Sequence, residues 1–105
     1  MQKSIIIKHP LQDTNELASV PLHYEITKEG NKTTLYCKVN LPEEKRPDWL
    51  NLNEFTIPSV YMEGSPGVTG TYFSEVKGCN VETALFLDSA YNQIRVAEKW
   101  LEMHQ

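Results

Sequence analysis

The last quarter of the chain, residues 81–104, carries the periodicity of one long amphipathic helix. With successive residues about 100° apart around a helix axis, many of its apolar side chains fall in a single arc. That arc comprises Ala84, Leu87, Ala90, Tyr91, Ile94, Ala97 and Leu101. Neither Pro nor Gly interrupts the segment, and the side-chain oxygen of Asn80 can cap the free amides of the first turn. We therefore expect a helix over residues 81–104 whose arc faces the core.

The same helix carries a second apolar stripe on a different side. This stripe consists of Leu85, Val96, Trp100 and Met103. A helix that lies on one face of a sheet needs only one such stripe, so the second implies another surface to pack against. We predict a partner-binding face centred on Trp100, which takes either a second copy of the chain across a two-fold axis or another protein. The alternative cover within the chain is the segment 43–53.

Before the helix, the distribution of apolar and polar residues predicts about five strands. The expected strands cover residues 3–8, 22–27, 35–41, 55–62 and 71–77. Ile5, Ile6 and Ile7 form a β-branched run, which is typical of a strand covered on both sides. The polar stretch from Leu11 to Val20 shows no periodicity and predicts a loop.

These elements combine most economically into one α+β domain that spans residues 1–105. An antiparallel sheet of about five strands, made of two hairpins and an N-terminal strand, packs against one long C-terminal helix. A chain of 105 residues can form one hydrophobic core without disulfides or metals. Its 40% of hydrophobic and 23% of charged residues are ordinary for a globular protein, so we expect a folded chain.

Charge and hydropathy argue against several classes of function. The net charge is −4 and the Lys and Arg residues are scattered, which argues against nucleic-acid binding, because that requires clustered cations. No run approaches the ~20 apolar residues of a membrane span and no secretory leader is visible, so we expect a cytoplasmic protein. Cys37 and Cys79 lack the spacing of a metal site, and we expect buried free thiols.

Catalytic and metal-binding groups do not converge in the sequence. His9, His23 and His104 are widely separated, so we expect no metal, no cofactor and no catalytic residue. The glycine-rich stretch 63–70 can aim backbone amides at an anion, which makes it a candidate ligand loop. Its candidate residues are Gly64, Ser65, Gly67 and Thr69. The alternative is a plain hairpin turn, since the stretch lacks the Lys-Ser/Thr ending of a phosphate-binding loop.

The charged segment 43–53 contains two candidates for partner recognition, Trp49 and Arg46. Both residue types are enriched at binding hot spots. Pro47 can open a short helical turn in this segment. The alternative is a lid, in which Trp49, Leu50 and Leu52 fold back over the helix or over the open edge of the sheet.

The lack of a catalytic constellation and the excess apolar surface of the helix favour a small non-enzymatic binding protein. It would be an accessory regulator or inhibitor that acts through protein–protein contacts. The alternative is a small-molecule-binding domain or small enzyme with a pocket between sheet and helix. Tyrosine joins apolar area to a polar tip, which suits such a pocket. The residues that would line it are Tyr24, Tyr61, Tyr72 and Tyr91.

Overall fold

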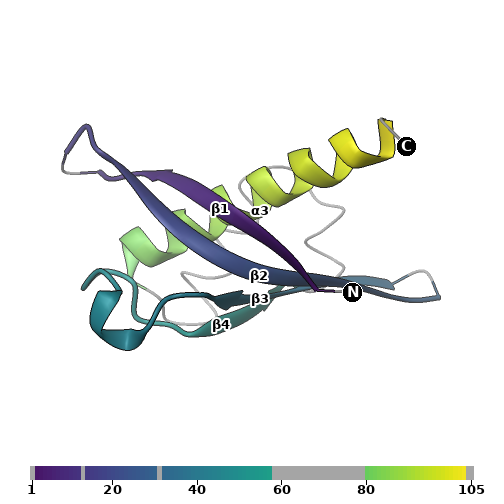
Figure 1. Ribbon diagram of the computed structural model, residues 1–105, viewed down its shortest axis with the longest axis horizontal. Coiled ribbons are helices and arrows are strands. Elements are labelled where there is room, and N and C mark those ends of the chain that lie inside the picture. Colours follow the sequence, from purple (N-terminus) through teal and green to yellow (C-terminus); the bar gives the residue numbers. More distant parts are fainter. Residues whose placement is uncertain (1, 13, 31, 58–79, 104–105) are drawn as a thin grey trace.

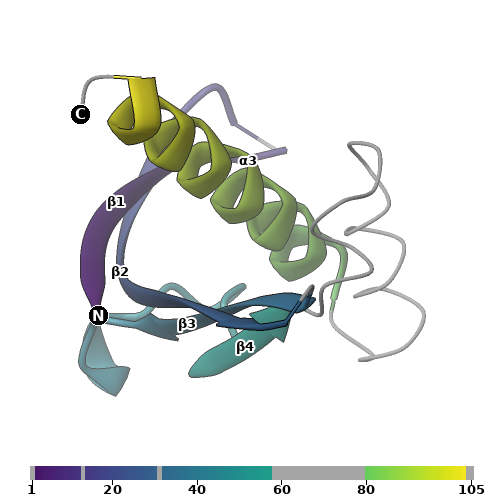
Figure 2. The ribbon, with the colours of Figure 1, turned by 90° about the vertical axis from the view of Figure 1, so that its right-hand side faces the viewer.

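In the computed structural model, an antiparallel sheet packs against one long helix (Figure 1). The structure describes residues 2–12, 14–30, 32–57 and 80–103, with the backbone alone for Lys32 and for residues 99–103. The elements in chain order are β1 (Lys3–Pro10), β2 (Leu17–Glu29), β3 (Lys32–Val39), the 3-10 helix η1 (Glu43–Lys45), β4 (Glu54–Ile57) and α3 (Val81–Met103). In the described part the strands lie in the order β1-β2-β3-β4, and α3 crosses one face of the twisted sheet (Figure 2). The expected α+β architecture is confirmed, and the described residues form four strands where about five were predicted.

The start of α3 follows from its capping residue. The amide of Thr83 donates to Asn80 Oδ1 at 2.7 Å, and the amide of Ala84 donates to the Asn80 carbonyl at 2.9 Å. A side-chain oxygen that accepts from a first-turn amide satisfies one of the donors that the helix leaves open. Glu82 lies in the same turn, where a carboxylate interacts favourably with the helix dipole. The predicted cap at Asn80 is confirmed.

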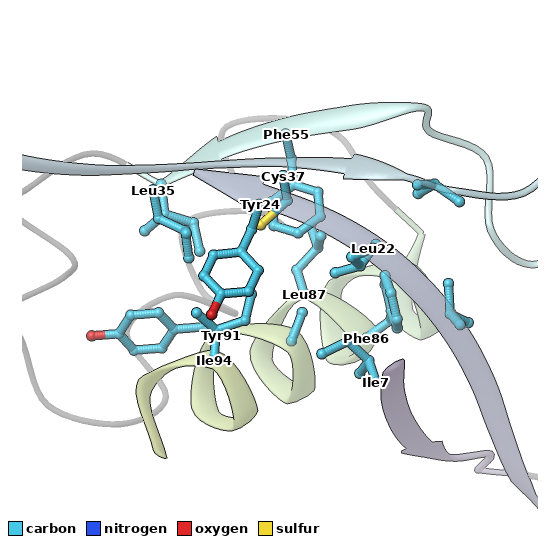
Figure 3. Close-up of a cluster of buried hydrophobic side chains, with 14 of the residues drawn as sticks. Ile7, Leu22, Tyr24, Leu35, Cys37, Phe55, Phe86, Leu87, Tyr91 and Ile94 are labelled. Atoms are coloured by element: carbon cyan, nitrogen blue, oxygen red, sulfur yellow. The ribbon is translucent and has the colours of Figure 1, made fainter. Parts of the chain in front are cut away.

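The core lies between α3 and the face of the sheet that it crosses (Figure 3). Alternate residues of the strands supply one half of it, namely Ile7, Val20, Leu22, Tyr24, Leu35, Cys37, Val39, Phe55 and Ile57. The helix supplies Ala84, Phe86, Leu87, Ala90, Tyr91 and Ile94. All of these helix residues except Phe86 belong to the predicted arc. Phe86 is buried because the rings of His9 and Trp49 pack against it.

β2 begins at Leu17, so the prediction of a loop up to Val20 is wrong. Its first residues alternate between the two faces of the sheet, and Val20, which pairs with Ile7, is buried. This alternation is hard to see in the sequence because Ser19 and Pro21 are residues typical of turns. The strand forms because pairing with β1 buries the apolar half of the alternation.

Pro21 fits into the central strand β2 because its missing amide faces the end of β3. The Pro21 carbonyl accepts from the amide of Asn40 at 2.9 Å, and Asn40 lies just beyond β3. In an antiparallel strand the N–H and C=O of one residue point to the same side, so an N–H at Pro21 would also face Asn40. The proline therefore removes no bond between β1 and β2.

β1 is covered on one face only, so the prediction of a strand covered on both sides is wrong. The side chain of Ile6 is 57% exposed on the face opposite α3. Its neighbours on that face are polar: Ser4 Oγ lies 3.0 Å from His23 Nδ1, and Lys8 Nζ donates to Ser19 Oγ at 2.8 Å. A run of isoleucines therefore does not by itself show that both faces are buried.

Several expectations fall on residues 58–79, outside the described part of the chain. They are the end of the strand predicted over 55–62, the loop 63–70, the strand 71–77 and Cys79. The start of the first of these strands is present as β4. Cys37 is a buried free thiol, as expected, and burial raises its pKa to about 12.

Candidate protein-binding edge

In the described part of the sheet β1 is an edge strand, and α3 closes its open side at one point. The amide of Lys8 donates to Gln93 Oε1 at 2.9 Å, and Gln93 Nε2 donates to the Lys8 carbonyl at 2.7 Å. The side-chain carboxamide thus makes the two backbone bonds that a neighbouring strand would make. It follows that the N–H and C=O of Lys8 point away from β2.

The backbone groups of Ser4 and Ile6 share this outward direction. In an antiparallel pair, alternate residues turn both N–H and C=O toward the partner strand, and the residues between them turn both away. Two contacts confirm which residues of β1 turn their backbone groups toward β2 and which turn them away. The Leu11 amide bonds across to the Glu16 carbonyl at 3.1 Å, and Pro21, opposite Ile6, directs its carbonyl away from β1. Ser4 and Ile6 therefore present their N–H and C=O groups at the open edge of the sheet.

An open, largely apolar groove of about 490 Å³ runs between this edge and α3. Its lining residues are Lys3, Ser4, Ile5, Tyr24, Gln93, Val96 and Ala97. On the helix side of the groove Val96 is 68% exposed, and on the other face of the same edge Ile6 is 57% exposed. Exposed backbone groups flanked by apolar side chains provide what an added strand requires: partners for its main chain and contact area for its alternate side chains.

Charges inside the groove are compensated. Lys3 Nζ lies 2.8 and 2.9 Å from the two carboxylate oxygens of Glu98, and the Tyr24 hydroxyl donates to Glu98 Oε1 at 2.8 Å. Partial burial alone would raise the pKa of Glu98, but the hydrogen bonds from Lys3 and Tyr24 lower it. Burial, together with the bond to this carboxylate, raises the pKa of Tyr24. The groove can therefore receive apolar groups without isolating a charge.

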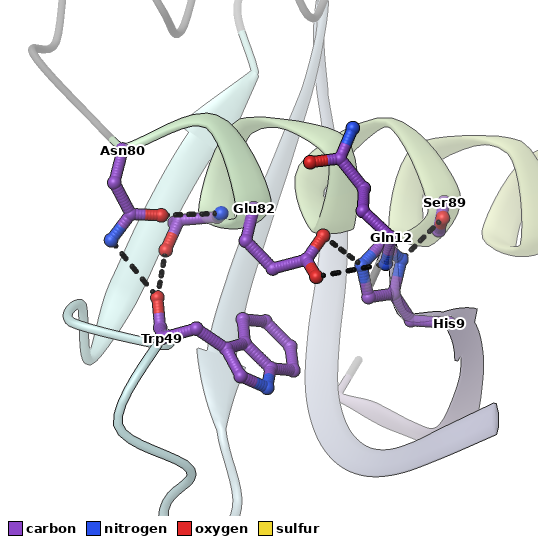
Figure 4. A network of polar contacts seen from close by, with 7 residues as sticks. His9, Gln12, Trp49, Asn80, Glu82 and Ser89 are labelled. Atoms are coloured by element: carbon purple, nitrogen blue, oxygen red, sulfur yellow. Dashed lines mark hydrogen bonds and ion pairs between the residues drawn. The ribbon is translucent and has the colours of Figure 1, made fainter. Parts of the chain in front are cut away.

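At the other end of β1, the buried side chain of His9 belongs to a partly buried polar cluster (Figure 4). His9 Nδ1 lies 3.0 Å from Ser89 Oγ, and His9 Nε2 lies 3.1 Å from Glu82 Oε2. The Gln12 amide donates to Glu82 Oε1 at 3.2 Å. Because a hydroxyl can donate or accept, both ring nitrogens have partners whether the imidazole is neutral or protonated. The cluster ties β1 to the first half of α3.

A serine, a histidine and a carboxylate in a row also form the side-chain chain of a hydrolytic triad. In this protein the His9 ring is only 2% exposed and packs against Trp49 and Phe86, with ring centroids 5.3 and 5.8 Å away. A catalytic base must reach the proton that it removes in a bound substrate complex. Aromatic rings enclose His9 instead, so we assign the cluster to structure.

The segment 43–53 packs over the start of α3, which is the arrangement of the predicted lid. Trp49 packs against Phe86 with centroids 5.7 Å apart, and Leu50 is 4% exposed. The Trp49 carbonyl accepts from Asn80 Nδ2 at 3.1 Å and from the hydroxyl of Thr83. These bonds use the residues that also cap α3, so the segment and the helix start form one unit.

Arg46 stabilises the fold of the same segment. Its Nε donates to the Leu41 carbonyl at 3.1 Å, and its guanidinium also bonds to Asn53 Oδ1. A turn begins at Pro47, whose carbonyl accepts from the Leu50 amide at 3.0 Å, while the short 3-10 helix of the segment lies earlier, at Glu43–Lys45. A polar hollow of about 700 Å³ lies beside it, lined by Lys38, Glu43, Arg46, Asn51, Leu52, Asn53 and Glu54. Recognition of a partner by Arg46 or Trp49 stays a prediction.

The second apolar stripe of α3 is described in part. Val96 is exposed and Leu85 is half-buried, while the side chains of Trp100 and Met103 lie outside the described part. The exposure of Val96 supports the prediction that the stripe is uncovered where it borders the groove. Its contact with a partner stays a prediction.

The remaining sequence-predicted sites are not assembled in the described part of the chain. The candidate ligand loop, Tyr61 and Tyr72 all fall within residues 58–79. Tyr24 and Tyr91 are 3% and 2% exposed and help to fill the core between sheet and helix. Among the described residues, no three His, Cys, Asp or Glu side chains gather closely enough to hold a metal ion.

Sequence reasoning missed the open edge at Ser4 and Ile6. Three successive isoleucines conceal which one faces outward, but the flanking residues carry a usable signal. Ser4 and Lys8 are polar and share the face of Ile6, because side chains alternate along a strand. No comparable signal marks Gln93, since a polar residue on a helix does not show which backbone group its carboxamide will reach.

No protein-family model, curated protein or solved structure matches this chain. Within the part of the chain that the structure describes, no helix combines the length and the apolar composition needed to cross a membrane. Arguments about function therefore rest on the geometry of the chain.

Proposed function

We propose that the protein is a non-enzymatic binding protein that accepts an extended strand of another protein chain at the Ser4–Ile6 edge of β1. The observation that supports this most directly is the outward direction of the Ser4 and Ile6 backbone groups beside an apolar groove. In strand addition, main-chain hydrogen bonds give affinity and the sites for alternate side chains give specificity. Such a protein would act as an accessory regulator or inhibitor by occupying a surface of its partner.

The groove favours a particular kind of strand. Side chains on its inner side would contact Ile5, Val96 and Ala97, which favours apolar residues at alternate positions. Gln93 already occupies the backbone of Lys8, so the added strand can pair only as far as Ile6. Because this pairing is short, apolar contacts must contribute a large share of the affinity.

The rest of β1 shows how exposed edges are normally protected. Edge strands avoid pairing with other chains through charged residues, prolines or covering side chains. Lys8, Pro10 and the carboxamide of Gln93 supply these devices at one end of β1. Ser4 and Ile6 lack an equivalent among the described contacts of the edge, which supports a binding role for that end.

The proline variant Ile6→Pro tests this function. It removes the outward N–H while leaving the bonds between β1 and β2 in place, because Ile6 turns its backbone groups away from β2. Extended peptides selected from a display library against the immobilised wild-type protein should bind Ile6→Pro about tenfold or more weakly. Ile6→Val keeps the N–H and the branched side chain and should bind as wild type does. Equal binding by the proline variant, with its circular dichroism unchanged, would contradict the proposal.

A further inference from the structure

We infer that the strand accepted at this edge is β1 of a second copy of the chain, which creates a symmetric dimer with one continuous sheet. The inference rests on the strand addition proposed above and names its partner. A two-fold axis perpendicular to the sheet places two β1 strands antiparallel, and an isologous interface uses the same patch on both copies. The patch must therefore be complementary to itself.

Gln93 restricts the register of the two strands. Outward residues must pair with outward residues, because only these turn N–H and C=O to the open side. If Ile6 faced the partner's Ile6, Ser4 would face the partner's Lys8, whose backbone groups are already bonded to Gln93. Shifting the strands places Ser4 opposite the partner's Ile6 and Ile6 opposite the partner's Ser4. Both pairs can then exchange both backbone bonds, and Lys8 remains with Gln93.

Shifting once more would use less of the strand. Ser4 would then face the partner's Ser4, and Ile6 would face the partner's Gln2, which lies outside β1. The register that pairs Ser4 with Ile6 keeps both hydrogen-bonded pairs within β1, so we assign it to the dimer.

In this register, apolar surface meets apolar surface on the inner face of the sheet. Ile5 faces the partner's Ile5 at a non-hydrogen-bonded position, where opposite side chains lie closest. Val96 and Ala97 line the groove beside each Ile5. The two grooves thus meet at the axis, and the dimer covers Val96, which is 68% exposed in the single chain.

The register is also compatible in charge. Lys3 faces the partner's Ile7. The ammonium group of Lys3 is bonded to Glu98 of its own chain at 2.8 Å. Lys8 faces the partner's Gln2. Like charges directly opposite each other destabilise paired strands, and none meet between residues 2 and 8, all of which the structure describes. The uncharged centre of the edge therefore accepts its own sequence without repulsion.

Cysteine cross-linking shows directly which residues of the two β1 strands lie opposite each other. Opposite Cβ atoms on paired strands lie about 4.5–5.5 Å apart and closer at non-hydrogen-bonded positions, which is near the span of a disulfide. We expect a covalent dimer from Ile5→Cys under mild oxidation. We expect little from Ser4→Cys, whose thiols meet only in the rejected register that places Ser4 opposite the partner's Ser4. The wild-type chain, in which Cys37 is buried, controls for disulfides at native cysteines.

Light scattering over a range of protein concentrations tests the dimer itself. Wild type should form dimers, and both Ile6→Pro and Val96→Glu should weaken association about tenfold or more with unchanged circular dichroism. Val96 is on the helix surface, so Val96→Glu keeps the test decisive if the proline variant fails to fold.

The outcomes separate the dimer from the proposed function. A wild-type chain that stays monomeric at every concentration would overturn the second copy as partner, while selected peptides that still bind at the edge would leave strand addition standing. A dimer that Ile6→Pro does not weaken would overturn the β1 edge as its interface, and selected peptides that bind Ile6→Pro as tightly as wild type would overturn strand addition as well. Cross-linking of Ser4→Cys in place of Ile5→Cys would overturn the register.

Discussion

The two ends of β1 meet the same helix in opposite ways. At one end, His9 is buried against Trp49 and Phe86 and bonded to residues of α3. At the other end, Ser4 and Ile6 turn their backbone groups outward beside an open groove. The helix contacts both ends, since Lys3 bonds to Glu98 at the open end, but among the described contacts only Gln93 of α3 bonds to the outward backbone groups of β1. The difference shows that this edge is protected by individual side chains such as Gln93. The backbone groups that no such side chain reaches, those of Ser4 and Ile6, stay open.

The largest effects should come from the core beneath the closed part of the sheet. Leu87→Ala and Ile94→Ala should each lower the free energy of unfolding by about 2–5 kcal/mol, because both side chains are at most 1% exposed. Urea denaturation measures the change. The matched control is Val96→Ala on the open side of the same helix, expected to lie within about 0.5 kcal/mol of wild type. Near-neutral values for Leu87 and Ile94 would show that a different face of α3 is buried.

The closed end of β1 should respond next most strongly. His9→Ala should lower the free energy of unfolding by about 1–3 kcal/mol, because Ser89 and Glu82 lose their partner in a partly buried site. Ser4→Ala removes an exposed contact to His23 and serves as the control, with a change below about 0.5 kcal/mol. Equal stability of the two variants would remove the distinction between the two ends.

A smaller, pH-dependent effect should come from Glu98 beside the groove. The pKa of Glu98 is lowered in the folded chain. Glu98 therefore stabilises the fold at pH values above its ordinary pKa of 4.5, and this stabilisation is lost as the pH falls through its pKa in the folded chain. Glu98→Gln should therefore cost about 0.5–1 kcal/mol at pH 7 and progressively less in acid. Denaturation curves of both proteins from pH 7 to pH 3 measure this, with the exposed Glu44→Gln as control. A cost that grows on acidification would reverse the assigned sign.

The smallest effect should come from the open edge. Ile6→Ala should change the free energy of unfolding by less than about 1 kcal/mol under dilute conditions, because the side chain is 57% exposed. Its neighbour Ile7 is fully buried, and Ile7→Ala should cost about 2–5 kcal/mol. Differential scanning calorimetry of the pair tests the face assignment, and similar costs for both would mean that Ile6 is covered.

Elements with local causes could be predicted from the sequence. The helix, its cap at Asn80 and the hairpin of β2 and β3 follow from periodicity and from side chains close in sequence. The early start of β2 could not be predicted, because Ser19 and Pro21 favour turns locally, and only pairing with β1 makes them part of a strand. Tertiary pairing overrides local preference at these residues.

The candidate sites were less predictable because they depend on residues far apart in the chain. His9 bonds to Glu82 and Ser89 across separations of 73 and 80 positions, which no local pattern reveals. The sequence left Trp49 as either a lid or an exposed anchor, and its packing against Phe86 corresponds to the lid. A helical wheel shows that α3 has two apolar stripes, but the surface that covers Val96 does not follow from the wheel.

Amide hydrogen exchange at β1, followed by NMR at low and high protein concentration, tests the open edge most directly. The amides of Ile5 and Ile7 face β2 and should exchange slowly at both concentrations. The amides of Ser4 and Ile6 should exchange rapidly in dilute protein and become protected as a strand is added at high concentration. Protection of Ser4 and Ile6 at low concentration, or rapid exchange of both at every concentration and with every selected peptide, would contradict the account.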